Sequence, residues 1–415
     1  MLRSVRQTSF LVLVAIISIA SPGLAQQART LEPGPARSVG MDESKVQAAV
    51  KLYRDALQKE NIRGAVLLVA RHGKIVVHEA MGWKNYAYKL PMEKDTIFQM
   101  ASTTKPITAT AILMLEEEGK LRTSDAVAKY FESFQNDKAK AITIHHLLSA
   151  SSGFRIGPIF YPFEKDETPS LRKAVDKFGK DGAAVEPGIS FSYSNAGFNT
   201  LAALVEDRSG KPLEEFFTER IYKPLGMVDT TNHDDPTKLA RMATHYGARM
   251  NAEGHVEFSR GYTPGDPPEY PVVRGSGGLI TTALDYAKFL QMYLDEGRFS
   301  GGRILSPQSV KRATTPNIKV AACPEAAKPC NTLTPFGIPE GSYAMGWFVS
   351  DQGVFSHLGG GANNGRYIWA DPGRDLLGVV LTTGGNDPRR DFQKLLEEAC
   401  TSTDRSELRK NGLAR

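Results

Sequence analysis

The sequence predicts an α+β fold, an α/β sandwich in which one antiparallel sheet is built from both ends of the chain and flanked by helices, with a mostly helical second lobe. Three observations lead to this prediction. Strand-like segments lie near both ends of the folded part, helix-like patterns fill the middle, and no internal repeat, GxGxxG or Walker-type loop interrupts this order. A cleft between the two lobes is the expected place for a binding site.

Residues 1–25 have the layout of a secretory signal peptide. Two arginines precede an apolar block over residues 10–20, and the small-residue site Gly23-Leu24-Ala25 follows it. The block is too short to span a bilayer by itself, although an uncleaved membrane anchor is the alternative interpretation. Cleavage after Ala25 predicts a periplasmic or secreted protein without a stable membrane span.

The folded domain is expected to occupy residues 41–400. Residues 26–40 are a Pro/Gly-rich polar linker and residues 401–415 a polar, charged tail, so both are expected to be disordered. The signal peptide carries two arginines and no acidic residue, so its loss lowers the formal charge from +5 to +3. With no long Lys/Arg run, this small excess does not indicate a nucleic-acid partner, and it says only that anionic substrates are not repelled.

Within this domain the elements follow a clear order. A helix pattern over Glu43–Gln58 is followed by two strands in GAVLLVARHGKIVVHEAMG, hinged at His72-Gly73. The helical lobe is expected over roughly 106–280. Further helix patterns cover Ile107–Glu117, Ala196–Glu206, Pro212–Ile221 and Ala283–Leu294. Near the C-terminus the strand signals are YAMGWFVSD, GVFSH, RYIWAD and LLGVVLTT, before a last helix, FQKLLEEAC.

The three cysteines all lie late in the chain. In an exported protein, Cys323 and Cys330 could close a small disulfide loop or remain as two thiols, and the sequence does not decide between them. Cys400 ends an amphipathic helix pattern and is better explained as a small buried residue than as a nucleophile. No His/Cys spacing suits zinc and no HExxH is present, so neither a metal nor a cofactor is expected.

A Ser-x-x-Lys pattern occurs twice. The copy from Ser170 to Lys173 follows a Thr-Pro pair and opens a short amphipathic pattern, which is typical of a helix cap beside a solvated lysine. The other copy, in FQMASTTKPITATAILML, places Ser102 at the start of an apolar helix and Lys105 one turn later on the same side. A helix start favours a developing anion, and a lysine held in a dry, cationic pocket can take a serine proton. The alternative for this pair is a capping serine and a snorkelling lysine.

Two other segments carry groups that would complete such a site. In Tyr193-Ser194-Asn195, the tyrosine could share a proton with Lys105 and Asn195 could hydrogen-bond a substrate carbonyl, although a lone tyrosine is more often a packed aromatic. In His357-Leu358-Gly359-Gly360, glycines beside a strand allow close approach, and the N–H groups of Gly360 and Ser102 are candidate oxyanion donors. Taken alone, this last segment is equally well explained as a tight turn.

Taken together, ASTTK, YSN and HLG resemble the Ser-x-x-Lys, Tyr-x-Asn and Lys/His-x-Gly elements of the serine β-lactamase and penicillin-binding protein superfamily. The middle element is similar to that of the class C branch, with its relatives among esterases, D-aminopeptidases and DD-carboxypeptidases. The resemblance implies a β-lactamase/transpeptidase-like fold, with Ser102 as the acylated nucleophile, Lys105 as its proton partner and Tyr193 as general acid/base. Asn195 would bind the substrate carbonyl. Whether Lys105 or Tyr193 is the formal base stays open.

The third element departs from the β-lactamase pattern. Where those enzymes usually carry Lys-Thr/Ser-Gly, this chain has His357 and Leu358, and a neutral histidine beside a leucine weakens two contacts to a substrate carboxylate. We therefore expect an exported serine hydrolase that forms an acyl-enzyme, with small esters and D-amino-acid peptides favoured over β-lactams. The alternatives are a penicillin-binding or sensor-like domain that acylates with little turnover, and a purely structural or interaction role. The absence of Gly-x-Ser-x-Gly disfavours an α/β-hydrolase.

Overall fold

The structure is a computed structural model that describes residues 28–155, 159–165, 167–268, 270–320, 341–360 and 365–401. The predicted signal peptide, Cys323, Cys330 and the tail beyond residue 401 lie outside the described residues. Among the described helices, none combines the length and the apolar character that a membrane crossing requires.

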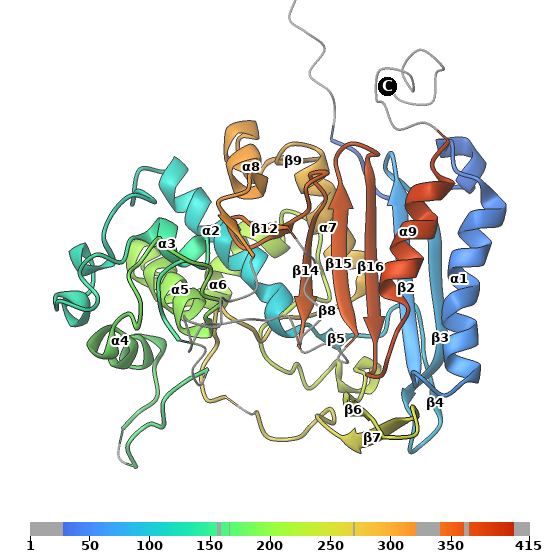
Figure 1. The fold of residues 1–415 in the computed structure, drawn as a ribbon, viewed down its shortest axis with the longest axis horizontal. Helices are drawn as coiled ribbons and strands as arrows, with labels where there is room; N and C mark the ends of the chain where they lie inside the picture. The colour runs from blue at the N-terminus through green and yellow to red at the C-terminus, as the bar shows by residue number, and fades with distance from the viewer. Residues whose placement is uncertain are drawn as a thin grey trace, which may run out of the picture.

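A ten-stranded sheet forms the centre of the described part of the protein (Figure 1), with the strand order β1-β3-β2-β16-β15-β14-β13-β12-β11 and β4 paired to β3. Its strands are β1 (Glu32–Pro33), β2 (Gly64–Arg71), β3 (Lys74–Asn85), β4 (Leu90–Pro91), β11 (Ile318–Lys319), β12 (Ser342–Tyr343), β13 (Phe348–Val349), β14 (Phe355–Gly359), β15 (Arg366–Asp371) and β16 (Leu376–Thr382). The C-terminal strand β16 pairs antiparallel with the N-terminal strand β2. The prediction of one sheet built from both termini is therefore confirmed.

Helices cover both faces of this sheet. α1 (Glu43–Gln58) and α9 (Arg389–Ala399) pack on one face, where they share an apolar cluster with Trp369. α7 (Ala283–Leu294) and α2 (Lys105–Glu117) belong to the larger core on the other face (Figure 1). Because both faces are covered, β2 and β14 to β16 are buried along their whole length, which explains their apolar runs.

The second lobe is helical over most of its length, and it lies to the left of the sheet in Figure 1. It contains α3 (Ile144–Leu148), α4 (Leu171–Asp181), α5 (Asn195–Ser209) and α6 (Leu213–Phe217), which continues into a π-helical turn (Thr218–Tyr222). The helix α8 (Pro307–Thr314) lies closer to the sheet. Ser170 is the N-cap of α4, and its Oγ accepts a hydrogen bond from the Lys173 N–H at 3.3 Å. The helix-cap interpretation of the second Ser-x-x-Lys is thereby confirmed.

The later part of the predicted helical lobe is not helical. A hairpin of β6 (Tyr246–Met250) and β7 (Val256–Arg260) forms there, and β8 (Ile280–Thr281) pairs with β5 (Phe98–Gln99). β9 (Arg298–Phe299) and β10 (Gly302–Arg303) form another short ladder. The start of β6 lies at the end of the main sheet, because the Tyr246 N–H donates to Thr383 O, just after β16, at 2.8 Å. The mostly helical lobe predicted over roughly 106–280 therefore includes a strand hairpin that the sequence patterns did not indicate.

The described part of the predicted linker, residues 28–40, is also ordered. β1 pairs with β3 in parallel, and a 3₁₀ turn (Ala36–Val39) follows. Arg29 forms ion pairs with Asp295 and Asp375. The expectation of disorder was wrong for these residues, because a Pro/Gly-rich composition does not reveal buried carboxylates that lie far away in the sequence.

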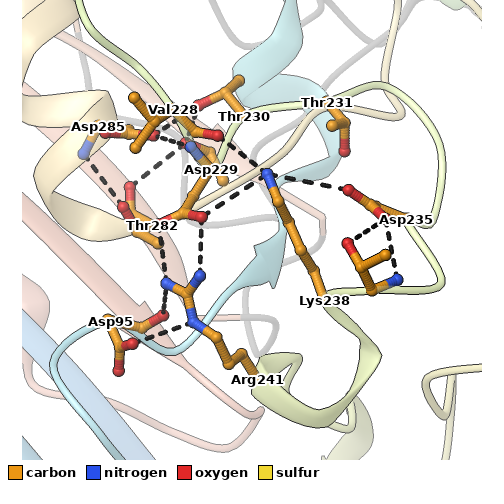
Figure 2. Close-up of polar contacts among 12 residues, drawn as sticks. Asp95, Val228, Asp229, Thr230, Thr231, Asp235, Lys238, Arg241, Thr282 and Asp285 are labelled. Atoms are coloured by element: carbon orange, nitrogen blue, oxygen red, sulfur yellow. Dashed lines mark hydrogen bonds and ion pairs between the residues drawn. The ribbon is translucent and has the colours of Figure 1, made fainter.

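An ion-pair cluster ties three loops together beside β5 and β8 (Figure 2). Arg241 donates to both carboxylate oxygens of Asp229 at 2.7 Å, and its Nε lies 3.0 Å from Asp95. The Asp229 N–H in turn donates to Asp285 at the start of α7, at 2.7 Å. Thr230, next to Asp229, is hydrogen-bonded through Oγ1 to Thr281 Oγ1 of β8 at 2.6 Å, so the cluster is tied to the strand that pairs with β5.

Candidate active site

Ser102 lies in a 3₁₀ turn, Ala101–Thr104, that continues directly into α2. Ala101 has a φ of +46°, in the left-handed region that costs a residue with a side chain about 1–3 kcal/mol. Thr104 holds the turn, because its Oγ1 donates to Ala101 O at 2.7 Å and accepts from the Leu279 N–H at 3.0 Å. The serine is thus presented on a strained turn that its neighbours keep in place.

Lys105 is fully buried, and its Nζ has three polar neighbours. It lies 3.0 Å from Ser102 Oγ, 3.0 Å from Asn195 Oδ1 and 2.8 Å from the Ser276 carbonyl oxygen. Burial lowers the pKa of Lys105 well below its usual range, and the positive charge of Arg274 lowers it further. The amine beside the serine hydroxyl therefore loses its proton more readily than an ordinary lysine does.

Tyr193 and Asn195 reach the same place from the start of α5. The Tyr193 hydroxyl is hydrogen-bonded to Ser102, and Lys105 Nζ lies 4.7 Å from the centre of the tyrosine ring. Burial raises the pKa of Tyr193, against the opposing effect of that hydrogen bond, so the phenol keeps its proton at neutral pH. Ser194 caps α5 by accepting from the Gly197 N–H at 3.3 Å, which fixes the residues on either side of it.

Sequence reasoning missed the turn that completes this arrangement, Arg274–Gly277. Thr108 Oγ1 donates to Gly275 O at 2.8 Å, and the Ser276 N–H donates to Asn199 Oδ1 at 3.1 Å. A side chain on Gly275 would collide with the Phe198 carbonyl oxygen, so only glycine fits. The turn is held so that its Ser276 carbonyl faces Lys105. The glycine-rich run RGSGG is the sequence feature from which this turn could have been predicted.

His357 of β14 lies on the same side as Tyr193. Its ring centre is 5.3 Å from that of Phe348 and 6.3 Å from that of Tyr193, and its Nδ1 lies 2.8 Å from Leu358 O. Burial, together with the nearby Lys105, lowers the pKa of His357 to about 3. The imidazole is therefore neutral at physiological pH and supplies no positive charge.

Leu358, in contrast, faces away from this site. Its side chain packs with Val354, Tyr367 and Trp369 in the apolar cluster beneath α1 and α9. Successive strand residues point to opposite faces, so His357 and Leu358 cannot both face Tyr193. Leu358 therefore offers no contact to a carboxylate bound on the Tyr193 side of β14.

The end of β14 lies directly against the serine turn. A side-chain carbon on Gly359 would collide with the Met100 carbonyl oxygen and would lie 2.8 Å from Cβ of Arg366. Gly360 follows with a φ of +79° and is exposed. All seven predicted site residues are thus gathered around one turn, at the junction of the sheet and the helical lobe.

Comparison with known proteins decides the family. The profile described as Beta-lactamase matches residues 49–400, most of the chain. The chain belongs to the beta-lactamase family. This confirms the family that the three motifs predicted, and with it the class of enzyme, a serine hydrolase.

Several known proteins are similar to this chain at modest sequence identity. Penicillin-binding protein 4 of Amycolatopsis lactamdurans is 28% identical over 344 residues, covering 80% of this chain and 84% of that protein. Among solved structures, EstCE1, a hydrolase with promiscuous acyltransferase activity, matches with a TM-score of 0.69 at 20% identity over 88% of this chain and 99% of its own. The D-amino acid amidase of Ochrobactrum anthropi SV3 matches with a TM-score of 0.66 at 20% identity, covering 85% and 98%. These structures confirm the predicted fold.

Proposed function

We propose that this protein is an exported serine hydrolase that cleaves ester or amide bonds through an acyl-enzyme on Ser102. The observation that carries the proposal is the environment of Lys105, a buried amine with a lowered pKa within 3.0 Å of Ser102 Oγ. A serine hydroxyl becomes a useful nucleophile when a base at this distance takes its proton.

Lys105 is the proton acceptor in this mechanism. In its neutral form the amine has two N–H groups and one lone pair, and the Ser276 carbonyl oxygen and Asn195 Oδ1 accept hydrogen bonds from the two N–H groups. The lone pair is left for the Ser102 hydroxyl. As Oγ attacks the substrate carbonyl carbon, its proton moves to Nζ and the carbonyl π electrons move onto oxygen.

Tyr193 acts on the leaving group. Its phenol is protonated at neutral pH, so it can donate that proton to the departing oxygen or nitrogen as the C–O or C–N bond breaks. The Lys105 ammonium then returns a proton to the phenolate. Water attacks the acyl-enzyme by the reverse sequence, giving the carboxylic acid and free Ser102.

The substrate oxygen would be held by backbone and amide donors. The N–H groups of Ser102 and Gly360 are the proposed oxyanion donors, and the end of β14 lies against the turn that carries Ser102. Asn195 accepts from Lys105 through Oδ1, which leaves its Nδ2 to donate to a substrate carbonyl.

Small carboxylic esters and D-amino-acid peptides are the favoured substrates, ahead of β-lactams. His357 is neutral, and Leu358 packs in the apolar cluster on the opposite face of the sheet. These two residues therefore do not supply the cation and the hydroxyl that usually bind a β-lactam carboxylate. The fold neighbours named as a hydrolase and a D-amino acid amidase support this order by analogy alone. The signal-peptide layout of residues 1–25 supports export to the periplasm or medium.

A penicillin-binding or sensor-like role is the second candidate, because the altered third element is compatible with acylation that is not followed by turnover. One experiment separates the two. A short-chain nitrophenyl ester, a D-alanyl anilide and a chromogenic cephalosporin are offered to the parent, to Ser102→Ala and to the matched control Ser170→Ala. Sustained turnover by the parent and the control, with loss in Ser102→Ala, supports a hydrolase. A persistent adduct without turnover supports the sensor.

A further inference from the structure

Two buried side chains outside the predicted site hold the turn whose carbonyl contacts Lys105. Thr108 follows Lys105 by one turn of α2, and Asn199 follows Asn195 by one turn of α5. Residues three or four apart share one face of a helix. Both side chains are fully buried. Thus α2 carries the amine, α5 carries one of its acceptors, and each helix adds a second polar side chain one turn further on.

These two side chains hold a single peptide group between them. Thr108 Oγ1 donates to the Gly275 carbonyl oxygen at 2.8 Å, and Asn199 Oδ1 accepts from the Ser276 N–H at 3.1 Å. The carbonyl and the N–H belong to the same planar peptide unit. Because α2 holds one side of this unit and α5 holds the other, its orientation is fixed. That orientation directs the next carbonyl, that of Ser276, to a point 2.8 Å from Lys105 Nζ.

The orientation of the Asn199 amide is fixed as well. Its Nδ2 donates to Ile159 O at 2.9 Å, which leaves Oδ1 for the Ser276 N–H. The turn also packs closely on α5, since a side-chain carbon on Gly275 would lie 2.5 Å from the Phe198 carbonyl oxygen. Asn199 therefore satisfies one backbone acceptor and one backbone donor, which neither a carboxylate nor an alkyl side chain of similar size can do.

The position of this turn matters for what Lys105 presents to Ser102. In the neutral amine, the lone pair is directed to the Ser102 hydroxyl while two acceptors take the N–H groups. Asn195 Oδ1 is one acceptor and the Ser276 carbonyl oxygen is the other. If the Ser276 carbonyl turned away, an N–H of the amine could point at Ser102 Oγ in place of the lone pair. A misplacement of about 1 Å at a reacting group can cost about 10²-fold in rate.

We infer that Asn199 and Thr108 are positioning residues for acylation, which act through the Gly275–Ser276 peptide to keep the lone pair of Lys105 directed at Ser102. Neither side chain gives or takes a proton in the reaction. The inference rests on the proposed hydrolase function and adds the residues that orient its proton acceptor.

The test measures how fast a fluorophosphonate labels Ser102. In this reaction Oγ attacks phosphorus, its proton moves to Lys105 and fluoride leaves, so no turnover is needed. In Asn199→Leu the maximal labelling rate should fall about 10- to 100-fold, whereas the concentration that gives half of this rate should change less than about 3-fold. Thr108→Val should show the same pattern, and Thr108→Ser, which keeps the hydroxyl, should recover most of the rate. Rates are compared on the alkaline plateau, so that a change in the pKa of Lys105 does not enter.

A double variant tests whether both side chains act on one peptide group. Asn199→Leu combined with Thr108→Val should be at most about 3-fold slower than the slower single variant, because the second substitution releases a peptide that the first has already freed. Losses that multiply would show two independent effects and would overturn the shared role.

Two matched controls separate positioning from a general loss of stability. Asn136→Leu removes an amide that donates to two backbone carbonyls in the helical lobe, and Thr200→Val removes a buried hydroxyl that donates within α5. Both should lower the melting temperature and keep the parent labelling rate. The inference fails if Asn199→Leu is labelled at the parent rate, or if the controls slow labelling as much as Asn199→Leu does.

The same measurements distinguish failure of this inference from failure of the proposed function. A parent protein that is labelled on Ser102 but releases no ester product would refute the hydrolase, while the rate in Asn199→Leu would still decide the positioning role. A parent protein that is not labelled on Ser102 would contradict both.

Discussion

Gly359→Ala should damage catalysis far more than folding. The added methyl group would collide with the Met100 carbonyl oxygen and lie 2.8 Å from Cβ of Arg366, so β14 must move away from the serine turn. Overpacking of this kind costs about 1–3 kcal/mol of stability. The same movement separates the Gly360 N–H from the Ser102 N–H, and loss of one oxyanion donor costs about 10²- to 10³-fold in kcat.

The matched control is Gly378→Ala in β16. A methyl group there would collide with the Trp369 ring, on the face of the sheet that α1 and α9 cover, away from Ser102. It should lower the melting temperature at least as much as Gly359→Ala does, yet the folded protein should keep the parent kcat. The assay is hydrolysis of 4-nitrophenyl acetate per mole of fluorophosphonate-reactive enzyme, beside thermal unfolding. A Gly359→Ala protein with the parent kcat would refute the oxyanion role of this strand end.

Three other predictions follow from the same geometry. Lys105→Met should fold but lose at least about 10³-fold in kcat, because the proton acceptor is gone; near-parent turnover would contradict this. In the parent, kcat/KM should fall as the pH decreases through the lowered pKa of Lys105, so the acid limb of the profile lies at a lower pH than the pKa of an ordinary lysine. His357, with a pKa of about 3, should add no inflection near pH 6.5. A pH profile of kcat/KM checks both expectations. Arg241→Gln should cost about 1–2 kcal/mol in urea unfolding while ester hydrolysis persists, because it breaks the paired bonds to Asp229 outside the site; an unchanged unfolding midpoint would contradict this.

Local signals predicted much of the fold. The bounds of α1 and α7 match the helix patterns of the sequence, and in the structure Asp42 and Thr282 are their N-caps. The strands β15 and β16 were also found, since burial on both faces gives them continuous apolar sequences. These features depend on neighbours within a few residues.

What sequence could not predict depends on contacts between distant segments. Lys105 and Ser276 are 171 residues apart, and nothing in either segment reveals that a backbone carbonyl meets the amine. Arg29 forms ion pairs with Asp295 and Asp375, and the composition of the residues around Arg29 could not predict these distant partners. The direction of Leu358 depended on which face of β14 the site occupies, and a three-residue motif does not give that face.

Identification of the acylated residue by mass spectrometry tests the central proposal most directly. The protein is treated with a fluorophosphonate, digested, and the adduct is located by peptide sequencing, with Ser102→Ala and Ser170→Ala proteins in parallel. We expect one adduct on Ser102 in the parent and in Ser170→Ala, and none in Ser102→Ala. Equal labelling of Ser102→Ala and the parent would contradict it.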